Sequence, residues 1–407
     1  MGQISFPQIV GRGCGLDVHK ETIVATIRGS GLEEETRTFG TFTEDLELFR
    51  DWLKGHSVTH IAMESTGVYW KPVFNILEKH FEILLVNARH IKYVPGHKTD
   101  KKDSAWIAKL LLSGLLKGSF IPPQVNRELR DLYRYKRKLV SQTVAERNRL
   151  QKILEDANIK LASVVNDVFG VSGQAIIAAL IKGETNPVAL AALAKGTLRK
   201  KQTELQAALR GNLTPHHQFM LKTIRKSLDN IEQIIAEVDN QIEQYLQQFR
   251  QEVELLQSIP GVARETATCL IAEIGIDMNV FPNQKHLSSW AGMCPGNNES
   301  AGKKKSEKTT KGNKTLKTAL TEAAWAASHR KDCYLQRKYY SLIGRRGKKR
   351  ALIAVGHKIL CAAYFILKYK RPYQEPNDVE LAEKRKQALI RRSIQRLHEL
   401  GVDLRLN

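Results

Sequence analysis

Within residues 14–121, short apolar segments alternate with amphipathic ones, and this alternation limits the fold of the 407-residue chain more than any other feature. Runs of four to six residues that are apolar or rich in β-branched residues predict strands, whereas apolar residues recurring every three or four positions predict helices. The predicted strands are Cys14–Val18, Thr22–Ile27, Glu35–Phe39, Thr59–Met63 and Ile83–Val86. The predicted helices are Glu44–Lys54, Val68–Lys79 and Asp100–Leu116, the last with Thr99 as its N-cap.

The connections between these segments predict how the strands pair. The first three strands follow one another through short connections, which favours an antiparallel meander. The later strands come with helical crossovers and should therefore pair in parallel. We expect a mixed α/β sheet flanked by helices, and Ile121-Pro-Pro123 indicates the end of this domain.

The remaining chain has mostly helical patterns. We expect a basic helix and coiled coil over residues 124–255 with a helical insert at about 159–217, a mainly helical C-terminal domain over 256–374, and a helical tail over 375–407. Helices are predicted near Leu316–Ser328, Lys349–Leu367 and Val379–Leu400, and the Gly-, Asn-, Ser- and Lys-rich block Gly292–Gly312 is predicted to be a loop.

A heptad-like pattern marks the middle of the chain. Nine apolar or aromatic residues follow 3,4 spacing: Leu221, Ile224, Leu228, Ile231, Ile235, Val238, Ile242, Tyr245 and Phe249. This spacing predicts a coiled-coil seam, either between two chains or against the basic helix that starts at Gln124, or a long helix packed on its own domain.

The net charge of +22 points to a polyanionic partner, most commonly nucleic acid. The five cysteines are scattered without a C-x-x-C pair, which argues against a disulfide framework or a zinc knuckle and fits a reducing cytoplasm. There is no signal-peptide pattern, and the apolar stretch Ile359–Leu367 is expected to be too short to span a bilayer. The sequence predicts a cytoplasmic protein without a membrane segment.

Four carboxylates stand out within the α/β pattern. Asp17 and Glu64 lie at the ends of two predicted strands, and Asp100 and Asp103 are three residues apart at the start of a predicted helix, so that they share a face. Like charges this close repel unless a cation neutralises them, although the helix dipole also tolerates acids in a first turn. Carboxylate oxygens are the ligands that pairs of hard cations need for phosphodiester chemistry. The pattern predicts a metal-dependent nucleic-acid active site.

The contexts of these acids resemble a known family. Gly-Leu-Asp17-Val-His-Lys, Met-Glu64-Ser-Thr-Gly and Lys-Thr-Asp100-Lys-Lys-Asp103 look like the DEDD set of insertion-sequence transposases with a RuvC-like N-terminal domain. Ser258-Ile-Pro-Gly-Val262 through Ala272-Glu-Ile-Gly275, Ser289-Trp-Ala-Gly-Met-Cys-Pro295 and Asn298-Glu-Ser-Ala-Gly302 look like the second domain of that family. The resemblance implies an RNase H fold for the first domain. It also implies that the four acids hold two magnesium ions, or manganese in their place.

The resemblance also implies a nucleophile and partners. The serine that attacks DNA in this family matches Ser300, although a serine in a Gly/Lys loop is by itself usually a turn residue. Lys303, Lys304 and Lys305 follow at once and could hold a scissile phosphate. Family members use a bridge RNA that pairs with target and donor DNA, so a guide RNA and a homo-oligomer, from dimer to tetramer, are implied.

Basic residues on two segments are candidates for backbone contacts with DNA or RNA. They are Arg130, Arg134, Arg137 and Lys138 in the predicted basic helix, and Arg345, Arg346, Lys348 and Lys349 in a later cluster. Tyr133 and Tyr135 interleave with the first set and could stack on unpaired bases. Ile259-Pro-Gly-Val262 is like a helix-hairpin-helix turn, whose backbone N–H groups can meet a phosphate, or is an ordinary turn between helices.

These observations favour an RNA-guided DNA recombinase that moves an insertion sequence. One rival is a RuvC-like structure-specific endonuclease, in which metal-activated water cuts DNA without a covalent intermediate. Another is a non-catalytic protein that only coats nucleic acid. All three hypotheses predict nucleic-acid binding that weakens as the salt concentration rises, so that measurement does not separate them. Substitutions of Ser300 and of the four acids separate them.

Overall fold

The computed structural model describes residues 9–65, 67–87, 100–296, 298–300, 303–306, 309–376 and 378–399. The chain divides into two compact units, Met1–Ile121 and Pro122–Asn407, which are described separately. Thr99, the predicted N-cap, lies outside the described residues.

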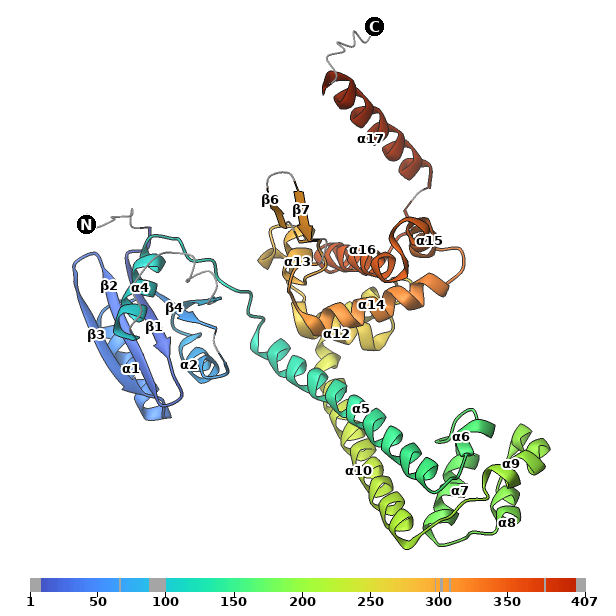
Figure 1. The fold of residues 1–407 in the computed structure, drawn as a ribbon. Helices are drawn as coiled ribbons and strands as arrows, with labels where there is room; N and C mark the ends of the chain where they lie inside the picture. The colour runs from blue at the N-terminus through green and yellow to red at the C-terminus, as the bar shows by residue number, and fades with distance from the viewer. Residues whose placement is uncertain are drawn as a thin grey trace. The chain divides into compact units, whose positions relative to one another are not determined.

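The first unit is a five-stranded mixed sheet with helices on both faces (Figure 1). The strands lie in the order β3-β2-β1-β4-β5, with β1–β2 and β2–β3 antiparallel and β1–β4 and β4–β5 parallel. The strands are β1 Arg12–Val18, β2 Thr22–Gly29, β3 Leu32–Gly40, β4 His60–Glu64 and β5 Glu82–Val86. The helices are α1 Thr43–Gly55, α2 Trp70–Leu77 and α4 Asp100–Leu112. The predicted mixed α/β sheet, with its meander and parallel additions, is confirmed.

Side chains of β1 alternate between two buried faces, because successive residues of a strand point to opposite sides. Cys14 and Leu16 belong to the core that α1 and α2 cover. On the other face, Ala62 of β4 packs with Ile107 and Leu111 of α4. The sheet is therefore enclosed on both sides along the middle of β1 and β4, and it is less buried at the ends of these strands.

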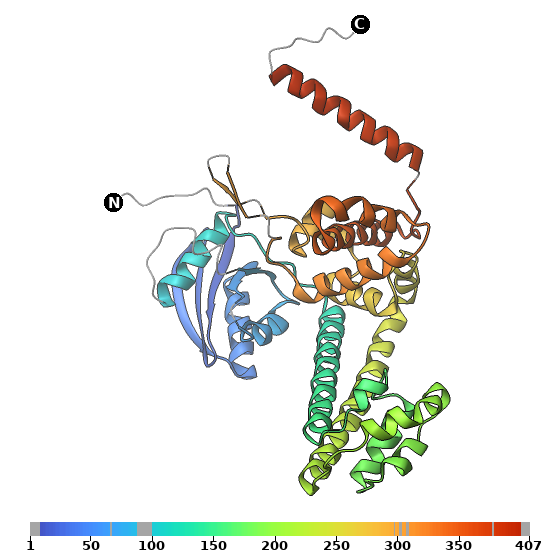
Figure 2. The same ribbon diagram turned by 45° about the vertical axis from the view of Figure 1, so that its right-hand side comes forward.

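The second unit is built on a long helical hairpin. Helix α5, Gln124–Asp156, and helix α10, Pro215–Leu246, run antiparallel, since Tyr245 of α10 bonds Glu128 near the start of α5, whereas His217 bonds Asp156 at its end. Figures 1 and 2 show the two helices side by side. The insert predicted between them is helical and consists of α6 Leu161–Val164, α7 Val171–Ile181, α8 Pro187–Ala192, a 3-10 helix at Gly196–Lys201 and α9 Gln202–Ala208.

The heptad pattern thus describes packing within the chain, which is one of the alternatives that the sequence left open. Leu221, Ile224 and Leu228 are buried with residues of α5 and of the insert. Ile231 and Ile235, in the middle of α10, are only half-buried. Pairing of protomers through this hairpin stays a prediction.

The C-terminal body of the second unit is mainly helical. Its elements are α11 Arg250–Gln257, α12 Arg264–Ile274, a 3-10 helix at Met278–Val280, α13 Gln284–Trp290, β6 Asn298–Ser300, β7 Lys303–Ser306, α14 Lys314–His329, α15 Tyr334–Arg346, α16 Lys348–Tyr369 and α17 Asp378–Glu399. Two findings differ from the sequence prediction. The block Gly292–Gly312 contains a two-stranded antiparallel hairpin rather than a plain loop, and α15 was not predicted.

Helix α16 also corrects an expectation about membrane segments. Among the described residues it is long and apolar enough to cross a membrane by length and composition, against the prediction that no stretch would be. Half of its most apolar window is buried, and Val355, Ile359 and Ala363 are fully covered. In this structure α16 is therefore a core helix of the C-terminal body.

Candidate active site

Asp17 and Glu64 lie at the carboxyl ends of two neighbouring parallel strands. The register pairs Leu16 of β1 with Met63 of β4, so Asp17 and Glu64 are the next residues of that ladder. Met63 joins the core under α1 and α2, whereas Ala62 faces α4. By alternation, both carboxylates therefore belong to the α4 face.

Helix α4 lies directly on this face. A Cβ atom on Gly15 would lie 2.2 Å from the Ser104 carbonyl oxygen and 2.3 Å from the Ala108 amide nitrogen, so only glycine allows the helix backbone to approach. A Cβ on Gly13 would meet Leu111 instead, which shows that α4 runs opposite to β1. The first turn of α4, residues 100–103, therefore lies beside the end of β1.

Hydrogen bonds fix this arrangement near the acids. Thr26 Oγ1, on the strand beside Gly15, lies 2.7 Å from Ser104 Oγ, the residue after Asp103. His19 Nε2 lies 3.1 Å from Asp17 Oδ2, and the Asp17 side chain is 20% exposed. The site is therefore open enough to accept a ligand while its backbone is held.

The structure brings three of the four predicted acids to one region. Strand pairing places Asp17 and Glu64 there, and the direction of α4 places the backbone of the half-buried Asp103 beside them. Asp100 begins the same helix, although its side chain lies outside the described side chains. No group of three or more His, Cys, Asp or Glu side chains with metal-binding geometry occurs among those that are described. The set nevertheless suits a hard cation, since every donor would be a carboxylate oxygen.

Ser300 ends β6 and pairs with Lys303 of β7. The side chains of Ser300, Lys303, Lys304 and Lys305 lie outside the described side chains, so their predicted roles remain predictions. What the structure gives is the backbone that carries them: an antiparallel hairpin in place of the predicted loop.

The base of this hairpin is closed by backbone contacts. Pro295 and Thr309 form an antiparallel bridge, and the Thr310 N–H donates to the Cys294 carbonyl at 3.1 Å. A Cβ on Gly312 would lie 2.3 Å from the Gly292 nitrogen, so the two ends of the segment touch through glycine backbones. The hairpin therefore projects from a narrow stem, which we call the hairpin stem (residues 292–295 and 309–312).

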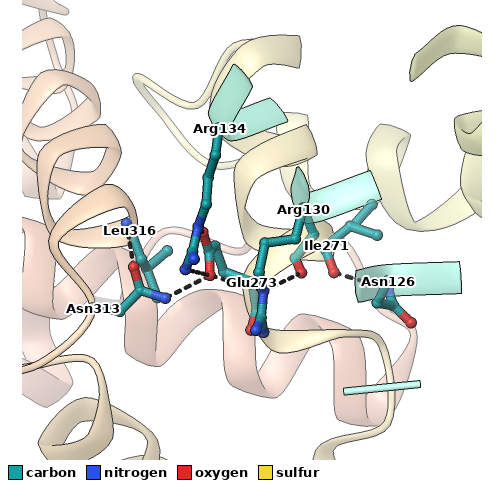
Figure 3. A network of polar contacts seen from close by, with 8 residues as sticks. Asn126, Arg130, Arg134, Ile271, Glu273, Asn313 and Leu316 are labelled. Atoms are coloured by element: carbon teal, nitrogen blue, oxygen red, sulfur yellow. Dashed lines mark hydrogen bonds and ion pairs between the residues drawn. The ribbon is translucent and has the colours of Figure 1, made fainter. Parts of the chain in front are cut away.

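Two arginines that were predicted to bind nucleic acid are occupied by a buried acid, Glu273 of α12 (Figure 3). Arg134 Nε and Nη2 donate to the two Glu273 carboxylate oxygens at 2.8 and 2.9 Å. Arg130 Nε lies 3.1 Å from Glu273 Oε2, and its Nη2 donates to the Glu273 carbonyl at 2.7 Å. Burial lowers the pKa of Arg130, although the Glu273 carboxylate opposes this shift. These contacts give Arg130 and Arg134 a structural role. Arg134 is still 45% exposed, and contact of these arginines with a phosphate stays a prediction.

Other candidates on α5 differ in exposure. Arg137 donates to both carboxylate oxygens of Glu322, at 3.2 and 2.8 Å, whereas Lys138 is exposed. Tyr133 is 1% exposed, so the prediction that it stacks on bases is wrong, and burial raises the pKa of its hydroxyl. Tyr135 is 48% exposed and is still able to stack on a base.

The second basic cluster lies at the turn between α15 and α16. Arg345, Arg346, Lys348 and Lys349 are exposed around Gly347, which has φ +76° and ends one helix as it begins the next. Lys348 and Lys349 at the start of α16 oppose its dipole, whereas Arg345 and Arg346 in the last turn of α15 complement the dipole of that helix. They fit a surface that meets an anion.

The predicted helix-hairpin-helix turn is buried against α14. Ile259 is 1% exposed, and Gly261, with φ +85°, would place a Cβ 2.4 Å from the Ala323 carbonyl oxygen. This turn therefore serves at least to pack α11 and α12 on the body. A phosphate contact through its backbone stays a prediction.

Sequence reasoning missed Glu273 and its partner Asn313. A signal existed, because Glu273 is the one charged residue in the run Thr266–Ile274 and every residue of that run is buried. A lone acid in such a stretch requires a partner. The sequence could not reveal which residues, far away along the chain, would supply it.

Comparison with known proteins finds matches to the α/β unit and to the C-terminal body. Residues 14–159 match a family of DEDD transposases of the IS110 type, described as "Transposase", and residues 253–341 match "Transposase IS116/IS110/IS902 family". The chain is 25% identical over 381 residues to the pilin gene-inverting protein of Moraxella bovis. This alignment covers 89% of this chain and 97% of that protein. The pilin gene-inverting protein of Moraxella lacunata matches over the same shares at the same identity. The chain therefore belongs to the IS110/IS116/IS902 family of transposases and is a DNA transposase or recombinase.

Proposed function

We propose that the protein recombines DNA through a serine nucleophile, with a divalent metal site in the α/β unit and a guide RNA choosing the DNA. The observation that carries the proposal is the placement of Asp17 and Glu64 on one face, at the ends of parallel strands, beside the first turn of α4. An RNase H or RuvC-like fold for this unit is supported by the five-stranded mixed sheet and its helices on both faces.

In this proposal, Asp17, Glu64, Asp100 and Asp103 hold magnesium, or manganese in its place. A bound divalent cation would supply Lewis-acid stabilisation of negative charge on a phosphate. The four carboxylates would fix the position of this cation. His19, which lies 3.1 Å from Asp17, orients this carboxylate.

The chemistry at Ser300 conserves bond energy. Its hydroxyl oxygen attacks a DNA phosphorus and gives up its proton, the bond from phosphorus to the 3′ oxygen breaks, and that oxygen takes up a proton and leaves as a 3′-hydroxyl. A 3′-hydroxyl of another strand then attacks the phosphoserine link and releases the serine. One phosphodiester is exchanged for another, so ATP is not required.

The proposal needs Ser300 and the acids to meet on one phosphate, within one chain or between two. The exposed cluster of Arg345, Arg346, Lys348 and Lys349 would contact nucleic-acid backbones. A homo-oligomer, from dimer to tetramer, would hold donor and target duplexes in the cytoplasm. The Moraxella relatives, whose name describes gene inversion, are consistent with cutting and rejoining.

Trapping of protein–DNA adducts tests the proposal. The wild-type protein with duplex DNA and magnesium should form a covalent adduct, and Ser300→Ala should not. An adduct that persists in Ser300→Ala would refute the nucleophile. Cutting by Ser300→Ala without any adduct would instead indicate a water-using nuclease.

A further inference from the structure

The hairpin that carries Ser300 is joined at its stem to the buried Glu273 by one side chain, Asn313. Asn313 directly follows Gly312 of the hairpin stem, and its Nδ2 donates to Glu273 Oε2 at 2.5 Å. Its Oδ1 accepts from the Leu316 N–H at 3.1 Å and so caps α14 (Figure 3). One asparagine thus ties the end of the hairpin to two helices at once.

Three side chains hold the Glu273 carboxylate, those of Arg130, Arg134 and Asn313. Its side chain is fully buried, and Arg134 binds it through two parallel bonds while Arg130 contacts the same carboxylate. Arg130 Nε and Asn126 Nδ2 also donate to the last carbonyls of α12, those of Ala272 and Ile271, at 3.3 and 2.9 Å. Such bidentate charged bonds restrict geometry as well as adding energy.

The position of the hairpin stem controls the position of Ser300. An extended strand rises about 3.3 Å per residue, so Ser300 can lie up to about 16 Å from the bridge at Pro295. A tilt of about 10° at the stem would move the tip by about 3 Å. Misplacement of a reacting group by about 1 Å can lower a rate by roughly 100-fold.

We propose that Glu273 is a positioning residue that acts through Asn313 to aim the Ser300 hairpin, with Arg134 and Arg130 holding Glu273 in place. This inference rests on the proposed function of Ser300. It gives the buried ionic cluster a role in the reaction in addition to its role in joining α5, α12 and α14.

Substitutions at Asn313 separate aiming from folding. Asn313→Ser keeps a hydroxyl that caps α14 but is too short to reach Glu273. Asn313→Asp keeps the cap and places a second carboxylate against Glu273. Asn186→Ser is the matched control, because Asn186 caps α8 in the insert by accepting from the Val188 N–H.

Two measurements on the full chain are required: amide hydrogen exchange of residues 295–310, and the single-turnover rate of strand cleavage alongside DNA affinity. Asn313→Ser should speed hairpin exchange at least about 10-fold, since a bond to a charged group is lost. It should slow cleavage by about 100-fold and leave the DNA dissociation constant within about two-fold. Asn313→Asp should slow cleavage at least as much as Asn313→Ser, because a second carboxylate beside Glu273 repels it.

The inference is overturned if Asn313→Ser matches Asn186→Ser in both measurements. Failure of the proposed function is distinguishable, because Ser300→Ala would then still form the adduct. The hydrogen-exchange data on residues 295–310 would in that case still test whether Asn313 and Glu273 hold the hairpin in place.

Discussion

Replacing Gly15 with alanine should separate α4 from the sheet without touching any proposed metal ligand. The added Cβ would lie 2.2 Å from the Ser104 carbonyl oxygen and 2.3 Å from the Ala108 nitrogen, both backbone atoms. Gly13→Ala is the matched control on the same strand and face. Its Cβ would meet the Leu111 Cδ2 atom at 2.9 Å, which is the tip of a side chain that can turn away.

The size of the effect follows from these distances. Ordinary contact begins near 3.4 Å, so α4 must move by about 1 Å to accept a methyl group at position 15, whereas Gly13→Ala requires only a rotamer change. Overpacking of this kind costs about 1–3 kcal/mol, and we expect about 2 kcal/mol for Gly15→Ala. For Gly13→Ala we expect less than about 1 kcal/mol. The same displacement carries Asp103 away from Asp17, which should weaken catalysis by about 100-fold.

Hydrogen exchange of α4 amides and single-turnover cleavage at several magnesium concentrations measure both consequences. Gly15→Ala should expose α4 to faster exchange and should raise the magnesium concentration needed for half-maximal cleavage. Equal behaviour of the two alanine variants would refute the inferred contact between α4 and β1. Faster exchange with normal cleavage would refute the link between α4 and the metal site.

Three further predictions concern stability, binding and pH. Glu273→Ala should lower the free energy of unfolding by about 3–5 kcal/mol in urea titrations, because a buried charge loses its partner, whereas Glu254→Ala, at an exposed pair, should change it by less than about 0.5 kcal/mol. Arg346→Ala should reduce the slope of log affinity for DNA against log salt by about 1, and an unchanged slope would remove this residue from the interface. Burial, and to a lesser extent Lys358, lowers the pKa of His357 below its ordinary 6.5, so the folded state disfavours the proton. The stability this contributes is present above pH 6.5 and is lost as pH falls through the lowered pKa, and His357→Gln should flatten that part of the unfolding profile.

The sheet was predictable because its signals are local. Each predicted strand of the first unit overlaps an observed one, since apolar runs such as Thr22–Ile27 are bounded by polar residues. The common face of Asp17 and Glu64 also follows from alternation once the strands pair in parallel. The proximity of α4 was not predictable, because a single glycine gives no sign of which helix will approach it.

The second unit shows where local signals fail. Leu335, Tyr339 and Leu342 have the spacing of a helix. The adjoining residues were interpreted only as a basic cluster, and α15 was not predicted. The hairpin of Asn298–Ser300 with Lys303–Ser306 lacks β-branched residues, so composition favoured a loop. In the same way, the local sequence of a basic helix does not show that an acid far away along the chain neutralises its arginines.

The central proposal, that the four acids form one metal site, is tested most directly by replacing magnesium with Fe²⁺. Ascorbate and peroxide then produce hydroxyl radicals that cut the polypeptide next to the bound ion. We predict cuts near Asp17, Glu64 and Asp100–Asp103 in the full chain, all suppressed by excess magnesium. Cuts confined to one of these segments, or cuts that magnesium does not suppress, would contradict the account.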